Sequence, residues 1–364
     1  MNSKLFVRVF FALFLFLVAA CSSPSTEPAP AQPAALEESA PPANPPPPGQ
    51  PALQETPAVP EEPLPVEPFR VAVVMPMAIN DLALNQSMYD ALLRVQEESG
   101  GAEKFKLAYT EGMFVSEDAA NVIRDYATQG YDLVIAHGLQ YGASLQEIAP
   151  EFPETSFAWG TSTDTFGLPN VFAYDAASQE GGYINGVIAA AMSKTGILGV
   201  VGPIEAGDTK LYVDGFIAGA KSVNPDITVS VNYIGSFSDI PQSTEAAKAH
   251  IAKGADVMTG TSQMVVGAIG VAAEHNALWF GTQSNQTSLA PGIVIANQVY
   301  HWEVVLQEMI NLIRIGTPGG QAFVINLANG GVVMEYSDAF EIPAIANESV
   351  QGIINGSISI KLSE

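Results

Sequence analysis

Cysteine is almost absent from this sequence, which contains a single one, Cys21, in 364 residues. No disulfide can form within one copy of the chain, so its folded part depends on a hydrophobic core. Hydrophobic residues make up 48% of the sequence, which is enough for cores of considerable size. At roughly 100–200 residues per domain, the length predicts two folded domains with additional segments.

Positive charge is also scarce, with 14 Lys and Arg against 38 Asp and Glu and a formal net charge of −24. Proteins bind nucleic acid by neutralising phosphates with clustered Lys and Arg, and this sequence has no such cluster. The composition therefore argues against a nucleic-acid partner. Strong acidity is instead typical of an exported protein that is kept soluble by its own charge.

Motifs for metal binding and for nucleophilic catalysis are missing as well. HExxH and CxxC spacings do not occur, and the Gly-Thr-Ser sequences at Gly160 and Gly260 lack the last glycine of a GxSxG elbow. The four histidines lie far apart in the sequence: His137, His250, His275 and His301. We therefore expect no metal site and no cofactor.

Two weaker patterns could still indicate an enzyme. The segment Gly202–Lys210 is similar to a phosphate-binding loop, but Asp208 stands where such a loop requires Lys. A carboxylate pair for glycoside hydrolysis could be drawn from Asp81, Glu111 and Asp239, and spacing alone leaves that alternative open. Without a stronger constellation, we expect a binding protein and not an enzyme.

The first 20 residues read as a secretion signal. Lys4 and Arg8 form a basic start, and the apolar run Val9–Val18 is shorter than the ~20 residues of a membrane-spanning helix. The sequence Leu17–Cys21 resembles the lipobox of bacterial lipoproteins, which implies that Cys21 becomes an acylated N-terminus. The alternative is an ordinary signal peptide with an incidental cysteine.

Residues 21–68 are predicted to form a lipidated cysteine and a tether. The segment Ser22–Pro68 consists mainly of Pro, Ala, Glu and Ser and contains no Lys or Arg. Such a composition cannot bury a core and favours an extended, polyproline-like chain. At ~3.1 Å per residue it could reach on the order of 100 Å from a bilayer.

Strands and helices are predicted to alternate from Phe69 onwards. Short β-branched runs such as Arg70–Pro76 and Leu133–His137 are typical of buried parallel strands, and stretches such as Gln86–Ser99 have helical spacing. A second series of the same kind begins at Gly196, and we expect the C-terminal segment after a helix near residues 301–315 to be rich in β-structure. The pattern predicts an α/β fold with two lobes, each built on a doubly wound parallel sheet.

In open parallel sheets, ligands bind beyond the carboxyl ends of the strands. The residues at these positions are mainly amides, carboxylates and aromatics, and only Lys210 brings a positive charge close to them. Among them are Asn80, Asp81, Asn85, Glu111, His137, Gln140, Tyr141, Trp159, Glu205, Tyr212, Phe237, Asp239, Gln263, Gln283 and Asn285. This set favours a neutral polyhydroxylated or heteroaromatic ligand over a phosphate or dicarboxylate, which would need Arg.

Several longer motifs resemble the basic-membrane-protein, or PnrA-like, family. They cover about Arg70 to Tyr336 in the family's order: Asp81–Ser87, Gly199–Ile204, Tyr212–Asp226, Tyr233–Asp239, Gly254–Gly260 and Phe280–Gln286. The resemblance implies a type I periplasmic-binding fold with three crossover strands at a hinge. It also implies two lobes. The N-terminal lobe contains residues 69–175 and 301–325, and the C-terminal lobe contains residues 176–300 and 326–364.

The resemblance further implies a lipoprotein on the extracytoplasmic face of the cell membrane. Such a receptor acts as a monomer that hands a small ligand, typically a purine nucleoside, to an ABC permease. A ligand sensor or a surface interaction protein on the same fold is the alternative. Family members stack the base on aromatic side chains, an interaction worth ~1–3 kcal/mol per base, and hold the sugar with carboxylates and amides.

The expected ligand contacts are Asp81, Asn85, His137, Tyr141, Trp159, Tyr212, Asp239, Gln263, Gln283 and Asn285. Asp81 and Asn85 match the first family motif, although both are also suited to capping the helix that follows. Leu84 replaces a phenylalanine of the family, so Tyr141 or Trp159 would have to supply that stacking face. Trp302 together with Gln283 resembles a branch associated with free purine bases, which leaves nucleoside and nucleobase both open.

Overall fold

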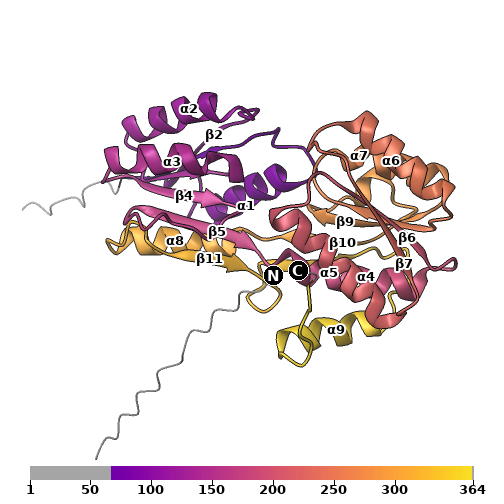
Figure 1. Ribbon diagram of the computed structural model, residues 1–364. Coiled ribbons are helices and arrows are strands. Elements are labelled where there is room, and N and C mark those ends of the chain that lie inside the picture. Colours follow the sequence, from indigo (N-terminus) through magenta and orange to yellow (C-terminus); the bar gives the residue numbers. More distant parts are fainter. Residues whose placement is uncertain (1–66, 363–364) are drawn as a thin grey trace, which may run out of the picture. The chain divides into compact units, whose positions relative to one another are not determined.

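The computed structural model describes residues 67–362, and these form two six-stranded sheets (Figure 1). The predicted signal segment, Cys21 and the tether up to residue 66 lie outside the described residues. The first sheet has the order β11-β5-β4-β3-β1-β2 and the second β12-β10-β9-β8-β6-β7. All neighbouring strands are parallel except β12, which runs antiparallel to β10. The predicted α/β class with two doubly wound sheets is confirmed.

The strands of the first sheet are β1 (Phe69–Val74), β2 (Phe105–Thr110), β3 (Leu133–Ala136), β4 (Ser156–Gly160), β5 (Val171–Ala176) and β11 (Ala322–Ile325). Those of the second are β6 (Ile197–Gly202), β7 (Thr228–Tyr233), β8 (Val257–Gly260), β9 (Leu278–Gln283), β10 (Val294–Tyr300) and β12 (Val332–Tyr336). Central strands such as β3 and β8 are buried at every residue, as expected for parallel strands covered on both faces.

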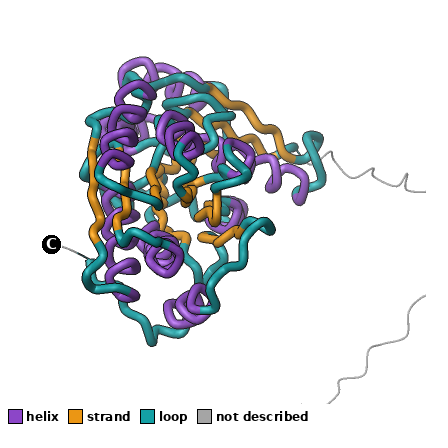
Figure 2. Tube along the Cα trace, turned by 90° about the vertical axis from the view of Figure 1, so that its right-hand side faces the viewer, coloured by secondary structure: helices purple, strands orange, loops and turns teal. Residues whose placement is uncertain are grey.

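Helices flank the strands, as the view turned by 90° shows (Figure 2). They are α1 (Leu84–Glu98), α2 (Ser116–Thr128), α3 (Gly142–Ile148), α4 (Ser178–Met192), α5 (Gly207–Val223), α6 (Ile240–Ala252), α7 (Val265–Glu274), α8 (Glu303–Arg314) and α9 (Ile345–Ile354). Short 3-10 turns cover Leu139–Tyr141, Ala149–Glu151 and Thr287–Leu289. The expectation of a β-rich C-terminal segment is right for β11 and β12 but wrong for α9, because its apolar residues recur at helical spacing and pack on α4.

The chain passes between the two sheets after β5, after β10 and after β11. Consequently α8 and β11, which come late in the sequence, lie beside the first sheet, where β11 pairs with β5 (Figure 1). The predicted lobe boundaries remain predictions, since sheet membership alone does not delimit lobes.

An aromatic cluster fills the interior where the chain passes between the sheets. Trp302 is fully buried and packs edge-on against Tyr174 and Tyr300, with ring centroids 5.3 and 5.2 Å apart. Its indole N–H donates to Ser87 Oγ on α1 at 2.9 Å. One side chain thus ties β5, β10 and α1 together, which makes Trp302 part of the core.

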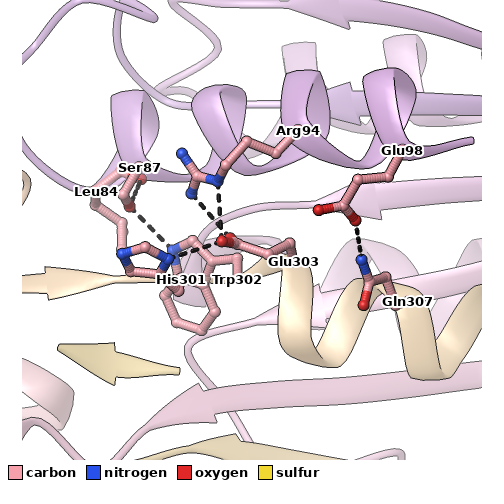
Figure 3. A network of polar contacts seen from close by, with 8 residues as sticks. All are labelled: Leu84, Ser87, Arg94, Glu98, His301, Trp302, Glu303 and Gln307. Carbon is pink, nitrogen blue, oxygen red and sulfur yellow. Dashed lines mark hydrogen bonds and ion pairs between the residues drawn. The ribbon is translucent and has the colours of Figure 1, made fainter. Parts of the chain in front are cut away.

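A row of polar contacts connects α1 and α8 beside this tryptophan (Figure 3). Arg94 donates to both carboxylate oxygens of Glu303, at 2.9 and 2.8 Å, and His301 Nδ1 lies 2.7 Å from Glu303 Oε1. Gln307 donates to Glu98 one turn further along. Burial works to raise the pKa of Glu303, but the hydrogen bonds from His301 and Arg94 outweigh it and lower the pKa to about 2. We call these five side chains the α1–α8 clasp.

Candidate functional site

A cavity of about 270 Å³ lies between the carboxyl ends of the two sheets' strands. Its wall on the side of the first sheet consists of Pro76, Met77, Leu84, Asn85, Phe114, Gly138, Leu139, Gln140 and Thr161. The side of the second sheet contributes Ile204, Ala206, Gly207, Asp208, Thr209, Phe237, Ser262, Gln263 and Gln283. These residues follow β1, β2, β3, β4, β6, β7 and β8 or, in the case of Gln283, end β9, so the strand-end rule locates the cavity correctly.

Apolar surface prevails in the wall, and apolar side chains stand on both of its sides. Met77, Leu84 and Phe114 come from loops after β1 and β2, and Phe237 comes from the loop after β7. None of the described residues that line the cavity is Lys or Arg. A flat apolar ligand without negative charge suits such a wall.

Asn85, in the first turn of α1, is the polar residue that sequence analysis places best. It is 1% exposed, and its amide Nδ2 donates to Asp81 Oδ2 at 2.6 Å. This bond determines which way the amide faces. Asn85 Oδ1 is buried without a hydrogen-bond partner among the described residues and belongs to the cavity wall. An unpaired buried acceptor of this kind costs about 1–3 kcal/mol unless a donor reaches it.

Asp81 supports that amide and does not itself line the cavity. Its carboxylate accepts hydrogen bonds from the backbone N–H groups of Ala83 at 2.9 Å and Gln86 at 3.1 Å, so it satisfies the start of α1. Burial raises the pKa of Asp81, while these hydrogen bonds and that of Asn85 act against the rise. The capping alternative for Asp81 therefore accounts for its observed contacts.

Gln283 and Asp208 form the corresponding polar pair on the second sheet. Gln283 ends β9 with a positive φ of 68°, is 2% exposed and donates from Nε2 to Asp208 Oδ2 at 3.4 Å. Gln283 Oε1 is buried without a partner among the described residues, like Asn85 Oδ1. A strained backbone that holds a buried polar side chain in a cavity wall is typical of a binding site.

Asp208 is a charged residue of this wall that sequence reasoning missed. It lies in the first turn of α5, and burial together with the nearby Asp175 raises its pKa to about 7. The sequence identified Asp208 only as the residue that breaks a phosphate-binding loop. Its place in the first turn of the helix that follows β6 is the signal that could have found it.

The structure brings three of the expected contacts into one cavity wall: Asn85, Gln263 and Gln283. Three others are buried beneath the wall of the first sheet. His137 has no exposed surface and contacts Tyr174 OH at 2.7 Å and Leu84 O at 3.1 Å, and burial lowers its pKa to about 4. Tyr141 donates to the backbone of Met113 at 2.6 Å.

Trp159 is the third of these and stacks on Phe166, with ring centroids 4.8 Å apart. Its indole N–H donates to the Gly138 carbonyl at 3.1 Å, so Trp159 supports a residue of the wall from behind. Direct ligand contact by His137, Tyr141 and Trp159 therefore remains a prediction without geometric support.

The remaining expected contacts lie elsewhere on the second sheet's side. Tyr212 is buried, with its hydroxyl 2.7 Å from Thr259 Oγ1. Asp239 caps α6 by accepting from the Gln242 N–H at 2.9 Å. Asn285 donates to Glu335 at 2.5 Å, beside a second, polar cavity of about 190 Å³. Their role in binding also stays a prediction.

Within residues 67–362, no group of three or more His, Cys, Asp or Glu side chains could hold a metal ion. In the same part of the chain, no helix is both long and apolar enough to span a membrane.

The family model described as "ABC transporter substrate-binding protein PnrA-like" matches residues 69–364. The chain belongs to this family. The predicted membership is thus confirmed, and the match covers the entire α/β part of the chain. The family consists of solute-binding proteins of ABC transporters, which agrees with a cavity between two sheets.

Three relatives of this chain differ in the role that their names give. The chain is 32% identical over 232 residues to the "Purine-binding protein BAB2_0673" of Brucella abortus, covering 64% of this chain and 65% of that relative, just under two thirds. It is 27% identical to the "Transcriptional activator protein med" of Bacillus subtilis, covering 73% and 81%. It is 28% identical to the "ABC transporter nucleoside-binding protein BmpA" of Lactococcus lactis, covering 78% and 86%.

Among solved structures, a solute-binding protein of an ABC transporter system from Conexibacter woesei is similar to this chain. Its TM-score is 0.69 at 24% identity, and the match covers 81% of this chain and 99% of the other. At this identity the likeness concerns the fold, and it confirms the type I periplasmic-binding architecture.

Proposed function

We propose that this family member binds a purine base or purine nucleoside in the 270 Å³ cavity and delivers it to an ABC permease. The observation that carries the proposal is that one wall combines apolar side chains with buried polar acceptors. Leu84 and Phe237 are apolar, whereas Asn85, Gln283 and Asp208 are polar acceptors. A purine has two π faces and a hydrogen-bonding edge, so its chemistry matches both parts.

The size of the cavity favours the smaller of the two ligands. Ligand pockets usually measure ~300–1,000 Å³, so a volume of about 270 Å³ lies just below that range. A free base would fill such a space, whereas a nucleoside would need the lobes to move apart. The name of the relative from Brucella abortus mentions a purine, and that of the relative from Lactococcus lactis mentions a nucleoside. Both kinds of ligand therefore have support from a relative.

Calorimetry on the full-length chain in mild detergent tests the ligand. Adenine, guanine, hypoxanthine and the corresponding nucleosides are titrated, and at least one base should bind with micromolar or tighter affinity. Phe237→Ala removes the aromatic face and should weaken binding by about 5- to 100-fold, given ~1–3 kcal/mol per stacked base. If no purine compound gives heat or a thermal shift, the proposed ligand class is wrong.

We propose further that Cys21 carries the lipid that anchors the protein outside the cytoplasm. The lipobox-like sequence Leu17–Cys21 and the Pro-rich segment after it support this proposal. Wild-type protein should partition into detergent and gain the mass of a diacylglyceryl group, whereas Cys21→Ser should do neither. A wild-type protein without added mass at its N-terminus would contradict the anchor.

Sensing is the second candidate, and the relative from Bacillus subtilis named as a transcriptional activator favours it. Transport and sensing share the cavity and differ in the partner that reads the closed form. Uptake of labelled adenine in cells that lack this protein separates the two, because only a transport receptor changes the rate of uptake.

A further inference from the structure

Three polar groups of the cavity wall are hydrogen-bond acceptors that await a donor. Asn85 Oδ1 and Gln283 Oε1 are buried and unpaired among the described residues, and both residues line the cavity. The third acceptor is the carboxylate of Asp208. Cationic side chains are missing from the cavity wall as described, so no residue there neutralises this carboxylate by an ion pair.

Two carboxylates determine the direction of the amides. Each amide group uses its N–H₂ on a carboxylate, Asn85 on Asp81 at 2.6 Å and Gln283 on Asp208 at 3.4 Å. A flip of either amide would place an oxygen against a carboxylate oxygen, which is repulsive. One N–H of each amide group is therefore occupied, and the unpaired amide oxygens are acceptors that the wall offers to a ligand.

We infer that Asp208 is a specificity-determining residue which, with Asn85 and Gln283, selects purines that present exocyclic N–H donors. The inference rests on the proposed function and deepens it from purines in general to aminopurines such as adenine. An exocyclic amino group can donate one N–H to a carboxylate and the other to an amide oxygen. An oxo group in the same place is itself an acceptor, so it can donate to neither. A site built to hydrogen-bond a group rejects the analogue that lacks it, because its own buried groups stay unpaired.

The electrostatic surroundings of Asp208 strengthen this selection. The titratable groups that face it are Asp175 on β5 and Tyr300 on β10. Neither is a cation, so a bound donor is the group that best stabilises the ionised carboxylate. Burial and Asp175 raise the pKa of Asp208 to about 7, and a ligand that donates to the carboxylate should therefore displace a fraction of a proton at neutral pH.

The test compares adenine, unsubstituted purine and hypoxanthine on the full-length chain by calorimetry. Wild type should prefer adenine over both by about 10- to 100-fold, the worth of a hydrogen bond to a charged group. Asp208→Asn replaces one acceptor oxygen with an N–H₂ of nearly equal size and should reduce that preference by at least about tenfold. The matched control Asp226→Asn lies at an exposed site outside the cavity wall and should keep the wild-type preference.

A second variant and a second measurement distinguish a loss of selectivity from misfolding of Asp208→Asn. Gln283→Met removes another acceptor without adding charge and should also lower the preference for adenine. Adenine binding at pH 7, measured in buffers of different ionisation enthalpy, should release protons from wild type and none from Asp208→Asn.

Two results would overturn the inference alone: equal binding of the three bases by wild type, or an undiminished preference in both Asp208→Asn and Gln283→Met. Failure of every purine to bind wild type would overturn the proposed function as well.

Discussion

At the scale of single residues, carboxylates in this protein act mainly on neighbouring polar groups. Asp81 orients an amide and satisfies the start of α1, and Asp239 caps α6. Asp208 differs, because it lines the cavity in addition to accepting hydrogen bonds from Gln283 and from the backbone N–H groups of Asp208 and Thr209. Retaining such a carboxylate makes the stability of the protein depend on pH, which gives a prediction independent of any ligand.

Asp208→Asn should gain stability relative to wild type as the pH rises from about 4 to about 7. The folded-state pKa of Asp208 is raised from 3.8 to about 7, so its protonated form favours folding and that contribution is lost as the pH rises through this window. The slope is at most about 1.4 kcal/mol per pH unit. Urea unfolding at a series of pH values measures the difference between variant and wild type, and Asp226→Asn serves as the control. A difference that does not change with pH would contradict the raised pKa.

At the scale of elements, α4 and α5 pack closely enough for their backbones to touch. A Cβ atom on Gly186 would lie 2.1 Å from the Phe216 carbonyl oxygen, and one on Gly219 would lie 2.0 Å from that of Tyr183. Backbone atoms cannot move aside as a flexible side chain can. The glycines of α4 and α5 therefore set the distance between the two helices.

Gly186→Ala should destabilise the protein by about 1–3 kcal/mol or more, because the added methyl forces the helices apart. The matched control is Gly270→Ala in α7, where nothing lies within 4 Å of the added Cβ. That change should be neutral or stabilising by up to about 1 kcal/mol, as expected for replacing glycine within a helix. Thermal unfolding of the two variants decides the matter, and similar melting temperatures would contradict this packing.

The α1–α8 clasp is the second element-scale contact with a measurable consequence. Glu303 has a side chain only 13% exposed and accepts two hydrogen bonds from Arg94. Arg94→Met should cost about 1–3 kcal/mol, since a partly buried carboxylate loses its charged donor. Lys248→Met breaks the exposed pair with Glu245 and should cost at most about 1 kcal/mol.

Acid unfolding gives the clasp prediction a further check. The pKa of Glu303 is lowered to about 2, so its stabilising contribution is present above its ordinary value of 4.5 and is lost as the pH falls through 2. The difference between wild type and Arg94→Met should shrink over this range. A constant difference would mean that Arg94 acts through packing instead of charge.

At the scale of the whole molecule, the sequence predicted the two sheets and the position of the cavity, but only part of its lining. Apolar runs that alternate with helical stretches indicate parallel strands, and the carboxyl ends of parallel strands lie at the same edge of a sheet. This rule correctly predicts that Asn85, Gln263 and Gln283 line the cavity. His137 and Tyr141 follow β3 and Trp159 lies near the end of β4, yet all three are buried beneath the wall. The direction of a side chain at a strand end depends on packing from distant segments, such as Trp302 beside His137, which no local pattern contains.

Closure around the ligand is the final expectation for the whole molecule. Both sheets contribute to the cavity wall, and the chain passes between them after β5, β10 and β11, the arrangement of a hinge. A ligand that bonds to Asn85 on one side and to Gln283 and Asp208 on the other has more contacts in a closed form than in an open one. Its binding must therefore shift the population toward closure.

Small-angle X-ray scattering should show a smaller radius of gyration for wild-type protein saturated with adenine than for the same protein without ligand. Inorganic phosphate at the same concentration should cause no change, because the described cavity wall offers an anion no Lys or Arg. The Asp208→Asn variant, saturated with adenine, should close less completely, since one of the contacts that bridge the two sides is weakened. An unchanged radius of gyration for saturated wild type would mean that the protein binds its ligand without closing, and that the partner recognises the ligand-bound surface itself.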